Sequence, residues 1–205
     1  MNRMPVAERR EQLIEAAITV ASRDGIEAAT VRAVAAEAGV SLGVVHYCFQ
    51  DKSELMRAMA HKITAQNAPT DLSELPDGMS TEDVVQAVVG AFWQSISTSR
   101  GSQLLSYELT TASLRHADLR EVALEQYRGQ RSAAEAVLEE IARVAGVEWA
   151  QPVPELARAI VAFVDGLSLS WLVDGDDDAA RESMIRFGEF LVTRTVAHGA
   201  ASSEA

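Results

Sequence analysis

Residues 30–49 constrain the fold more than any other part of the chain. Thr30 is a residue type that caps helix N-termini, and small apolar residues follow it at helical spacing. Gly39 stands where a helix ends in the left-handed conformation that glycine adopts without strain. Ser41 is a second capping residue, and the helix after it is expected to end near Phe49. Two short helices joined by a tight turn form a helix-turn-helix, whose second helix enters the major groove of DNA.

The same spacing also fits an αα-corner in an ordinary helical core, and the flanking residues favour DNA binding over that alternative. Gly43 has no side chain, so the backbone of the second helix can approach bases or phosphates. Arg9 and Arg10 lie at the start of a helix expected over 7–24, where the helix dipole favours acidic residues. We therefore expect these two cations to face an external phosphate. Lys52 follows directly after the second helix.

These residues resemble the N-terminal domain of the TetR family of bacterial transcriptional repressors. The resemblance in detail covers about residues 7–62, and the remainder agrees in length and helicity. The matching motifs are Thr30-x-Arg32-x-Val34-Ala35, Ala38-Gly39-Val40-Ser41-x-Gly43 and Tyr47-x-Phe49-x-x-Lys52-x-x-Leu55.

The resemblance implies that phosphates are contacted by Thr30, Arg32 and Lys52. It also implies that bases are faced from the second helix, which carries Leu42 where the family often has lysine and His46 where it often has tyrosine. The DNA-binding residues expected from the helix start and from the resemblance are Arg9, Arg10, Thr30, Arg32, Ser41, Leu42, Gly43, His46, Tyr47 and Lys52.

The charge distribution is compatible with DNA binding although the formal net charge is −12. Residues 1–64 hold eight basic and eight acidic residues, and the rest holds 10 basic and 22 acidic residues. The whole negative excess therefore follows residue 64. An acidic trunk repels DNA and orients a neutral, DNA-binding head toward it.

The remainder of the chain predicts an all-α fold, because it lacks strand alternation and internal repeats. An N-terminal three-helix helix-turn-helix domain (1–52) is followed by a helical ligand-binding and dimerisation domain (53–198) and a disordered tail (199–205). The helices expected in the second domain cover residues 53–66, 80–99, 102–114, 118–145, 155–173 and about 178–198.

The last two helices are apolar on more than one face, which indicates a second packing partner. A two-fold homodimer through a four-helix bundle satisfies this pattern, whereas a well-buried hairpin in a monomer is the alternative. The residues expected at the dimer interface are Ile160, Phe163, Val164, Phe187, Phe190 and Leu191.

A ligand site is also expected in the second domain. Polar residues interrupt the inward stripe of the long helix, and a buried amide costs free energy unless it is hydrogen-bonded. Internal hydrogen bonds and ordinary aromatic core packing are the alternative. The candidate residues are Trp93, Tyr107, Thr111, Gln126, Tyr127, Gln130 and Trp171. An apolar pocket with such neutral anchors suits a neutral or weakly polar organic molecule.

Enzymatic and metal-binding functions find little support. The four histidines lack metal-ligand spacing, and the acidic run at 174–178 is followed by Ala179 where a calcium loop requires glycine. We therefore expect no cofactor, no metal and no catalytic residue. The single cysteine, Cys48, excludes an internal disulfide framework. We also expect no apolar run of the roughly 18–20 residues that span a bilayer, no signal peptide, and a cytoplasmic location.

The resulting interpretation is a ligand-responsive repressor that binds a palindromic operator as a homodimer. In this hypothesis, an unidentified small organic molecule moves the helix at 53–66, separates the two recognition helices and releases DNA. Two alternatives remain: a helical protein that binds or converts a small molecule, and a helix-turn-helix activator without ligand-controlled release.

Overall fold

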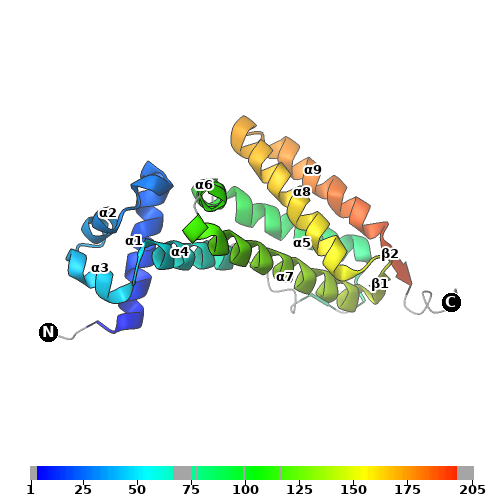
Figure 1. Ribbon diagram of the computed structural model, residues 1–205. Coiled ribbons are helices and arrows are strands. Elements are labelled where there is room, and N and C mark those ends of the chain that lie inside the picture. Colours follow the sequence, from blue (N-terminus) through cyan, green and yellow to red (C-terminus); the bar gives the residue numbers. More distant parts are fainter. Residues whose placement is uncertain (1–3, 67–74, 77, 99, 116, 198–205) are drawn as a thin grey trace. The chain divides into compact units, whose positions relative to one another are not determined.

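The computed structural model describes residues 4–66, 75–76, 78–98, 100–115 and 117–197 (Figure 1). Their contacts divide the chain into two compact units, one from residues 1–66 and 100–127 and the other from 67–99 and 128–205. The elements in chain order are α1 (Val6–Asp24), η1 (Ile26–Ala28), α2 (Val31–Glu37), α3 (Leu42–Cys48), α4 (Lys52–Gln66), α5 (Thr81–Ser97), α6 (Arg100–Arg115), η2 (Ala117–Leu119), α7 (Arg120–Ala145), β1 (Val147–Trp149), α8 (Val153–Asp174), α9 (Asp177–Val192) and β2 (Thr195–Ala197).

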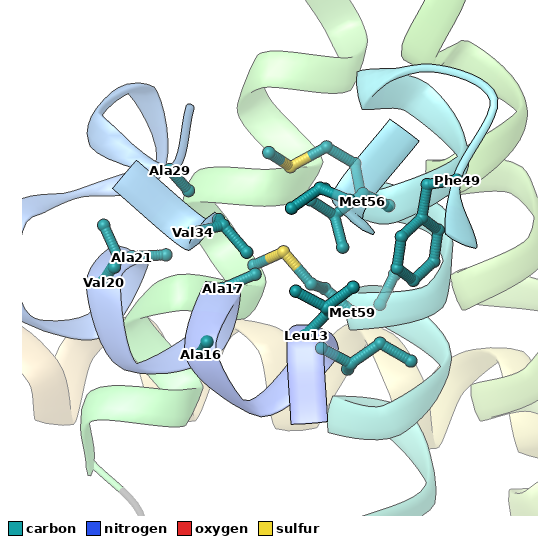
Figure 2. Packing of buried hydrophobic residues seen from close by; sticks show 14 of the residues in the cluster. Leu13, Ala16, Ala17, Val20, Ala21, Ala29, Val34, Phe49, Met56 and Met59 are labelled. Carbon is teal, nitrogen blue, oxygen red and sulfur yellow. The ribbon is translucent and has the colours of Figure 1, made fainter. Parts of the chain in front are cut away.

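The first unit is built around one apolar cluster that joins the helix-turn-helix to its neighbours. Side chains of α1, α2 and α4 meet there, among them Leu13, Val34 and Met59, each fully buried (Figure 2). Leu105 and Leu109 of α6 belong to the same cluster. The helices of the helix-turn-helix and α6 therefore share one core, so a movement of α6 displaces side chains that pack against α1 and α4.

Local capping chemistry explains where the first helices begin and end. Thr30 Oγ1 accepts a hydrogen bond from the Ala33 backbone N–H at 3.2 Å, as expected for a helix N-cap. Gly39 has φ +65°, the left-handed value that permits the turn before α3. Ser41 precedes α3 in the N-cap position, but its side chain makes no capping hydrogen bond.

The second unit is a helical layer in which α9 packs against both α5 and α8. Gly188 of α9 is buried where the two valines Val85 and Val89 of α5 approach it. Asp176 caps α9 by accepting a hydrogen bond from the Ala179 backbone N–H at 3.0 Å. Trp171 on α8 packs edge-on against Trp93 of α5, with ring centroids 5.6 Å apart.

Two features of the second unit differ from expectation. The last helix ends at Val192 rather than near residue 198, and β2 pairs antiparallel with β1. The hydroxyls of Thr193 and Thr195 donate to carbonyls of the last helical turn, which competes with continuation of the helix. In the first unit, α6 begins at Arg100, two residues earlier than expected. The fold remains all-α with one short ribbon.

Helix α8 also corrects the expectation about membrane-spanning segments. It is 22 residues long, and its most apolar 18-residue window has a mean hydropathy of 1.6, which meets the length and composition of a membrane span. Only 22% of its most apolar window is buried inside the protein. One such helix does not establish a membrane span, because core helices of soluble proteins pass the same test of length and composition. What the structure shows is an apolar helix that is mostly exposed within one protomer.

Candidate nucleic-acid interface and ligand site

Helix α3 presents one face to solvent and fixes the other in the core. Val45, Cys48 and Phe49 are buried beneath it. The outward side chains include Leu42 and Tyr47, which are 41% and 68% exposed. A β-carbon added to Gly43 would meet only Ser41 Oγ, at 3.9 Å, so packing within the protein does not require glycine there. All five residues expected to face DNA are exposed on this side: Ser41, Leu42, Gly43, His46 and Tyr47.

The residues expected at phosphates lie around this face. Arg32 on α2 and Lys52 at the start of α4 are both exposed. Thr30 is exposed as well, and its hydroxyl oxygen already accepts the capping hydrogen bond from Ala33. The hydroxyl proton of Thr30 remains available to donate to an external acceptor, because a hydroxyl is both donor and acceptor.

The two arginines of α1 have partners inside the protein. Arg10 donates through Nη1 to the carbonyl of Cys48, pairs through Nη2 with Glu54 at 2.8 Å, and lies 4.2 Å above the centre of the Phe49 ring. Arg9 donates through Nη1 to the side-chain oxygen of Gln12 at 2.5 Å. Their observed partners are therefore protein groups, whereas the dipole argument had them facing phosphate.

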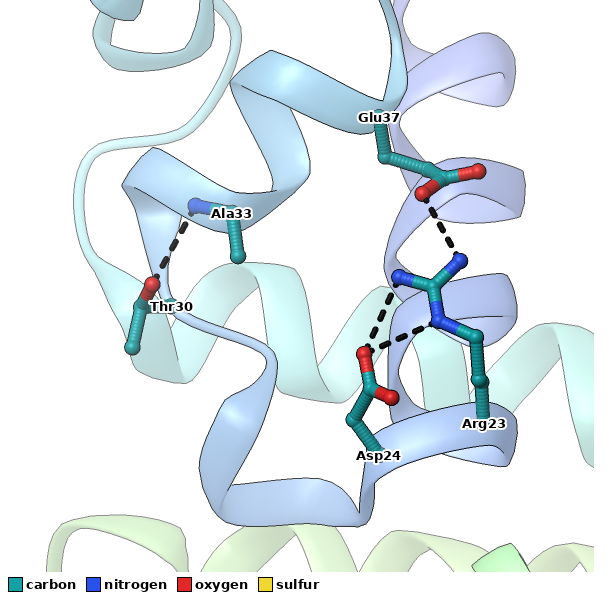
Figure 3. Close-up of polar contacts among 5 residues, drawn as sticks. All are labelled: Arg23, Asp24, Thr30, Ala33 and Glu37. Atoms are coloured by element: carbon teal, nitrogen blue, oxygen red, sulfur yellow. Dashed lines mark hydrogen bonds and ion pairs between the residues drawn. The ribbon is translucent and has the colours of Figure 1, made fainter.

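Ion pairs tie the helices of the head together. Arg23 near the end of α1 pairs with Asp24 at 3.0 Å and with Glu37 of α2 at 3.1 Å (Figure 3). The hydrogen bond to Asp24, and then that to Glu37, raise the pKa of Arg23. Lys62 of α4 pairs with two carboxylates of α1, Glu11 and Glu15, and both hydrogen bonds raise its pKa. These pairs are largely exposed, so each adds little stability but restricts how the helices rotate.

The expected ligand residues fall into both units. In the first, Gln126 is buried and donates to Ser106 Oγ at 2.6 Å, while Thr110 donates to its oxygen at 3.4 Å. The side chain of Gln126 is therefore hydrogen-bonded within the protein, which is the alternative to a role in ligand binding. Thr111 is exposed and donates to the carbonyls of Tyr107 and Glu108 in its own helix. Tyr107 and Tyr127 are half-buried in this unit.

In the second unit, Trp93 and Trp171 form the aromatic pair, and Trp171 Nε1 donates to Asp177 at 2.6 Å. Among the described residues, the buried side-chain oxygen of Gln130 finds no hydrogen-bond partner. The same holds for the buried hydroxyl of Ser168, one turn before Trp171, which the sequence analysis did not identify. In the sequence, Ser168 is marked only by its position three residues before Trp171, and this spacing does not distinguish it from other helical serines.

Some of the residues expected at the dimer interface form an aromatic surface, and the others are part of the core of the protomer. Phe163 and Phe187 stack with centroids 3.9 Å apart, and Phe190, 45% exposed, lies beside Phe187. Val164 packs into the core around Trp171, Ile160 packs against the buried cluster of α7 and α8, and Leu191 is buried. Leu169 and Val173 of α8 are exposed apolar residues that the sequence analysis did not assign to the interface.

Two family models match the chain. The model described as "Bacterial regulatory proteins, tetR family" covers residues 13–59, and "Tetracyclin repressor-like, C-terminal domain" covers residues 79–188. Together these ranges include more than half of the chain. The first range contains the helix-turn-helix, and the second contains α5 to most of α9.

Similar proteins of known function are repressors and regulators of the same family. The nicotine-responsive transcriptional repressor HdnoR of Paenarthrobacter nicotinovorans is 32% identical over 183 residues, covering 85% of this chain and 89% of its own. The transcriptional regulator BetI of Escherichia coli (strain K12 / DH10B) is 31% identical over 170 residues, covering 82% and 84%.

Solved structures agree with this assignment. The multidrug binding protein EbrR, complexed with imidazole, has a TM-score of 0.61 and 32% identity, covering 87% of this chain and 93% of its own. The same protein complexed with ethidium has a TM-score of 0.62 and 30% identity. Because family models, curated relatives and structures converge, the chain belongs to the TetR family and is a ligand-responsive, DNA-binding regulator of transcription rather than an enzyme.

Proposed function

We propose that this protein represses transcription as a homodimer that places α3 of each protomer in the major groove of a palindromic operator. The observation that carries the proposal is the two-sided character of α3. Its inner residues Val45 and Cys48 are buried, while Tyr47 and the backbone at Gly43 are open to solvent. A helix anchored on one face and bare on the other is able to present side chains to base edges.

In this proposal, Tyr47 and His46 read bases and the exposed cations Arg32 and Lys52 hold phosphates. Ser41 contributes a hydroxyl that is not used for capping, and Gly43 permits close approach of the helix backbone. Phosphate contacts set the position on the duplex, whereas base contacts supply the preference for one sequence. We retain the domain limits 1–52 and 53–198 for these two functions, while α6 and the start of α7 pack with the head. The residues 199–205 lie outside the described part of the chain.

The dimer interface is assigned to α8 and α9. Leu169, Val173 and Phe190 expose apolar side chains on these two helices, and most of α8 is unburied within one protomer. Association of two such pairs into a four-helix bundle removes this surface from water. Phe163 and Phe187, which stack on each other, extend the same aromatic surface.

The ligand is proposed to be a nitrogenous organic base. HdnoR responds to nicotine, and EbrR was solved with imidazole and with ethidium. This differs from the neutral molecule that the residue pattern alone favoured. The negative charge of the chain after residue 64 attracts such cations. In the second unit, Trp93 and Trp171 offer aromatic faces for a cation, and Gln130 and Ser168 offer unpartnered hydrogen-bonding groups.

Release of DNA is proposed to pass through the core of the first unit. Leu105 and Leu109 of α6 pack in the same cluster as Leu13 of α1, and the Ile26 backbone N–H donates to Glu108 of α6 at 2.9 Å. Any displacement of α6 that accompanies ligand binding therefore moves α1 and α4 with it. This movement changes the distance between the α3 helices of the two protomers, which then no longer matches the distance between two half-sites. The ligand must bind the released state more tightly than the DNA-bound state.

The DNA-binding proposal is tested by selecting a duplex from random sequences and measuring its affinity by fluorescence anisotropy at several salt concentrations. Arg32→Ala should weaken binding to all duplexes and reduce the salt slope by about 1.8, because the homodimer loses one phosphate contact of about 0.9 from each protomer. Arg143→Ala is the matched control, because Arg143 is an exposed arginine of the second unit. Tyr47→Ala should remove the preference for the selected duplex without changing the slope.

A protein that prefers no duplex at low salt would refute the proposal and favour a small-molecule-binding protein instead. Ligand binding is tested with nicotine and ethidium by quenching of tryptophan fluorescence in the absence of DNA. Operator release is tested with nicotine alone, because ethidium intercalates into the duplex. A reporter gene in a deletion strain should be expressed more strongly; lower expression would identify an activator. Sedimentation as a monomer at micromolar concentration would refute the dimer.

We place the protein in the cytoplasm, where a regulator of bacterial transcription meets its DNA.

A further inference from the structure

Two side chains of α1 donate hydrogen bonds to the ends of α2 and α3, and a third supports one of them. We call Arg9, Arg10 and Gln12 the α1 bracket. Gln12 donates through Nε2 to the carbonyl of Ala38, the C-cap of α2, at 3.1 Å. Arg10 donates to the carbonyl of Cys48, the last residue of α3. Arg9 donates to the Gln12 side-chain oxygen, which holds the amide with its nitrogen toward α2.

These carbonyls are the groups that a short helix leaves unpaired. The last four carbonyls of any helix lack a partner within it and carry the negative end of the helix dipole. α3 has only seven residues, and helices so short are unstable alone, so contacts with neighbouring elements determine how α3 lies. A guanidinium at the Cys48 carbonyl satisfies that group and fixes one end of the recognition helix to α1.

Arg10 is itself held from the other side. Glu54 of α4 accepts from Arg10 Nη2 at 2.8 Å and also from the Gln50 backbone N–H at 2.7 Å. The ring of Phe49 lies beneath the guanidinium, 4.2 Å from its centre. Arg10 therefore joins α1, the end of α3 and the start of α4, and its charge is balanced by Glu54.

We propose that Arg10 and Gln12 are positioning residues that set the orientation of the recognition helix, and that Arg10 is not a phosphate contact. The inference rests on the proposed role of α3 in reading DNA. A positioning residue affects the preference for one sequence, because a tilted α3 misplaces Tyr47 on the bases. A phosphate contact affects all sequences alike and changes the dependence on salt.

The test measures affinity for the selected operator and for an unrelated duplex, with the salt slope of each. Arg10→Ala and Arg10→Lys should both lower operator affinity about tenfold or more and leave the affinity for unrelated DNA within about twofold. Lysine keeps the charge but not the planar fork that contacts the Cys48 carbonyl and Glu54 together. Gln12→Met should have the same effect to a smaller degree.

Glu54→Gln separates the two explanations most sharply. Removing an anion near DNA strengthens binding to every duplex if only charge matters. Positioning instead predicts weaker operator binding with an unchanged salt slope. The double variant Arg10→Ala/Glu54→Gln should be no worse than Arg10→Ala, because both changes break the same contact.

The matched control is Lys62→Met. Lys62 also links α1 to α4 through ion pairs, with Glu11 and Glu15, but it donates to neither carbonyl of the helix-turn-helix. This change should leave the ratio of operator to unrelated affinity unaltered. All affinities are measured well below each variant's thermal midpoint, so that loss of folded protein is not read as loss of preference.

The outcomes distinguish the two proposals. A salt slope reduced by about 1.8 in Arg10→Ala, which is about 0.9 for each protomer of the dimer, tighter binding by Glu54→Gln, or an unchanged affinity ratio in the Arg10 variants would overturn the inference alone. A wild-type protein without preference for any duplex would overturn the proposed function, and the inference with it.

Discussion

Replacing Gly188 by alanine tests how closely α9 lies against α5. A β-carbon at Gly188 would lie 3.0 Å from Val85 Cγ1 and 3.1 Å from Val89 Cγ2. Carbon atoms in ordinary contact are about 3.5–4.0 Å apart, so either the valines must change rotamer or the helices must separate. Valine in a helix has one strongly preferred χ1 rotamer. We therefore expect the helices to separate by a few tenths of an ångström.

The magnitude follows from two opposing terms. Overpacking a close-packed core costs about 1–3 kcal/mol, and replacing a helical glycine by alanine stabilises the helix by up to about 1 kcal/mol. We expect Gly188→Ala to lower the free energy of unfolding by about 1 kcal/mol. Gly90 of α5 is the matched control, because it is a helical glycine with no atom within 4 Å of an added β-carbon. Gly90→Ala should raise the free energy of unfolding by about 0.5–1 kcal/mol.

The assay is urea unfolding followed by circular dichroism, with the midpoint compared at an unchanged m-value. The protein concentration is kept fixed because the stability of a dimer depends on it. Val85→Ala removes one of the two contacting valines, so the double variant should be less destabilised than the sum of the single changes. If Gly188→Ala stabilised the protein as much as Gly90→Ala does, the close approach of α9 to α5 would be refuted.

Two further predictions concern the first unit. Leu13 is 0% exposed, and Leu13→Ala should lower the free energy of unfolding by about 2–5 kcal/mol through the cavity it leaves; Val6→Ala, at an exposed position of the same helix, should change it by less than about 0.5 kcal/mol. The hydrogen bond from the Gln50 backbone N–H, and then that from Arg10, lower the pKa of Glu54 below its ordinary value of 4.5. Because the folded pKa is depressed, the stabilisation is present above pH 4.5 and is lost as the pH falls through the lower, folded value. The difference in urea midpoint between wild type and Glu54→Gln should therefore stay constant near neutral pH and shrink in acid; a difference that grows in acid would contradict this.

The parts of the fold that follow from chemistry within a few residues could be predicted from the sequence. Thr30 and Asp176 cap their helices through hydrogen bonds to N–H groups three residues ahead. Gly39 and Gly25 have positive φ at the ends of α2 and α1. For the two caps, the N–H partner lies three residues away in the same helix, so the local sequence contains both members of the interaction.

The ribbon of β1 and β2 could not be predicted in this way. Each strand has only three residues, too few to show the alternation of a strand. The pairing of Glu148 with Val196 joins segments that are distant in the chain. The length of α9 was overestimated for the same reason, because Thr195 to Ala197 leave the helix to pair with β1. Ser168 was missed because one hydroxyl on an apolar helix face is not distinctive until its missing partner is seen.

Arg10 shows why a cation's partner cannot be deduced from its place in a helix. The dipole argument correctly requires negative charge near the start of α1, but a phosphate, a carboxylate and a helix-end carbonyl all meet that requirement. The carbonyl of Cys48 lies 38 residues along the chain and is brought to Arg10 only by the packing of α3 against α1. With Arg10 balanced by Glu54, attraction to phosphates depends on exposed cations such as Arg32 and Lys52. Operator preference then depends on how α3 is held, which makes the orientation of α1 part of DNA recognition although its bracket contacts no base.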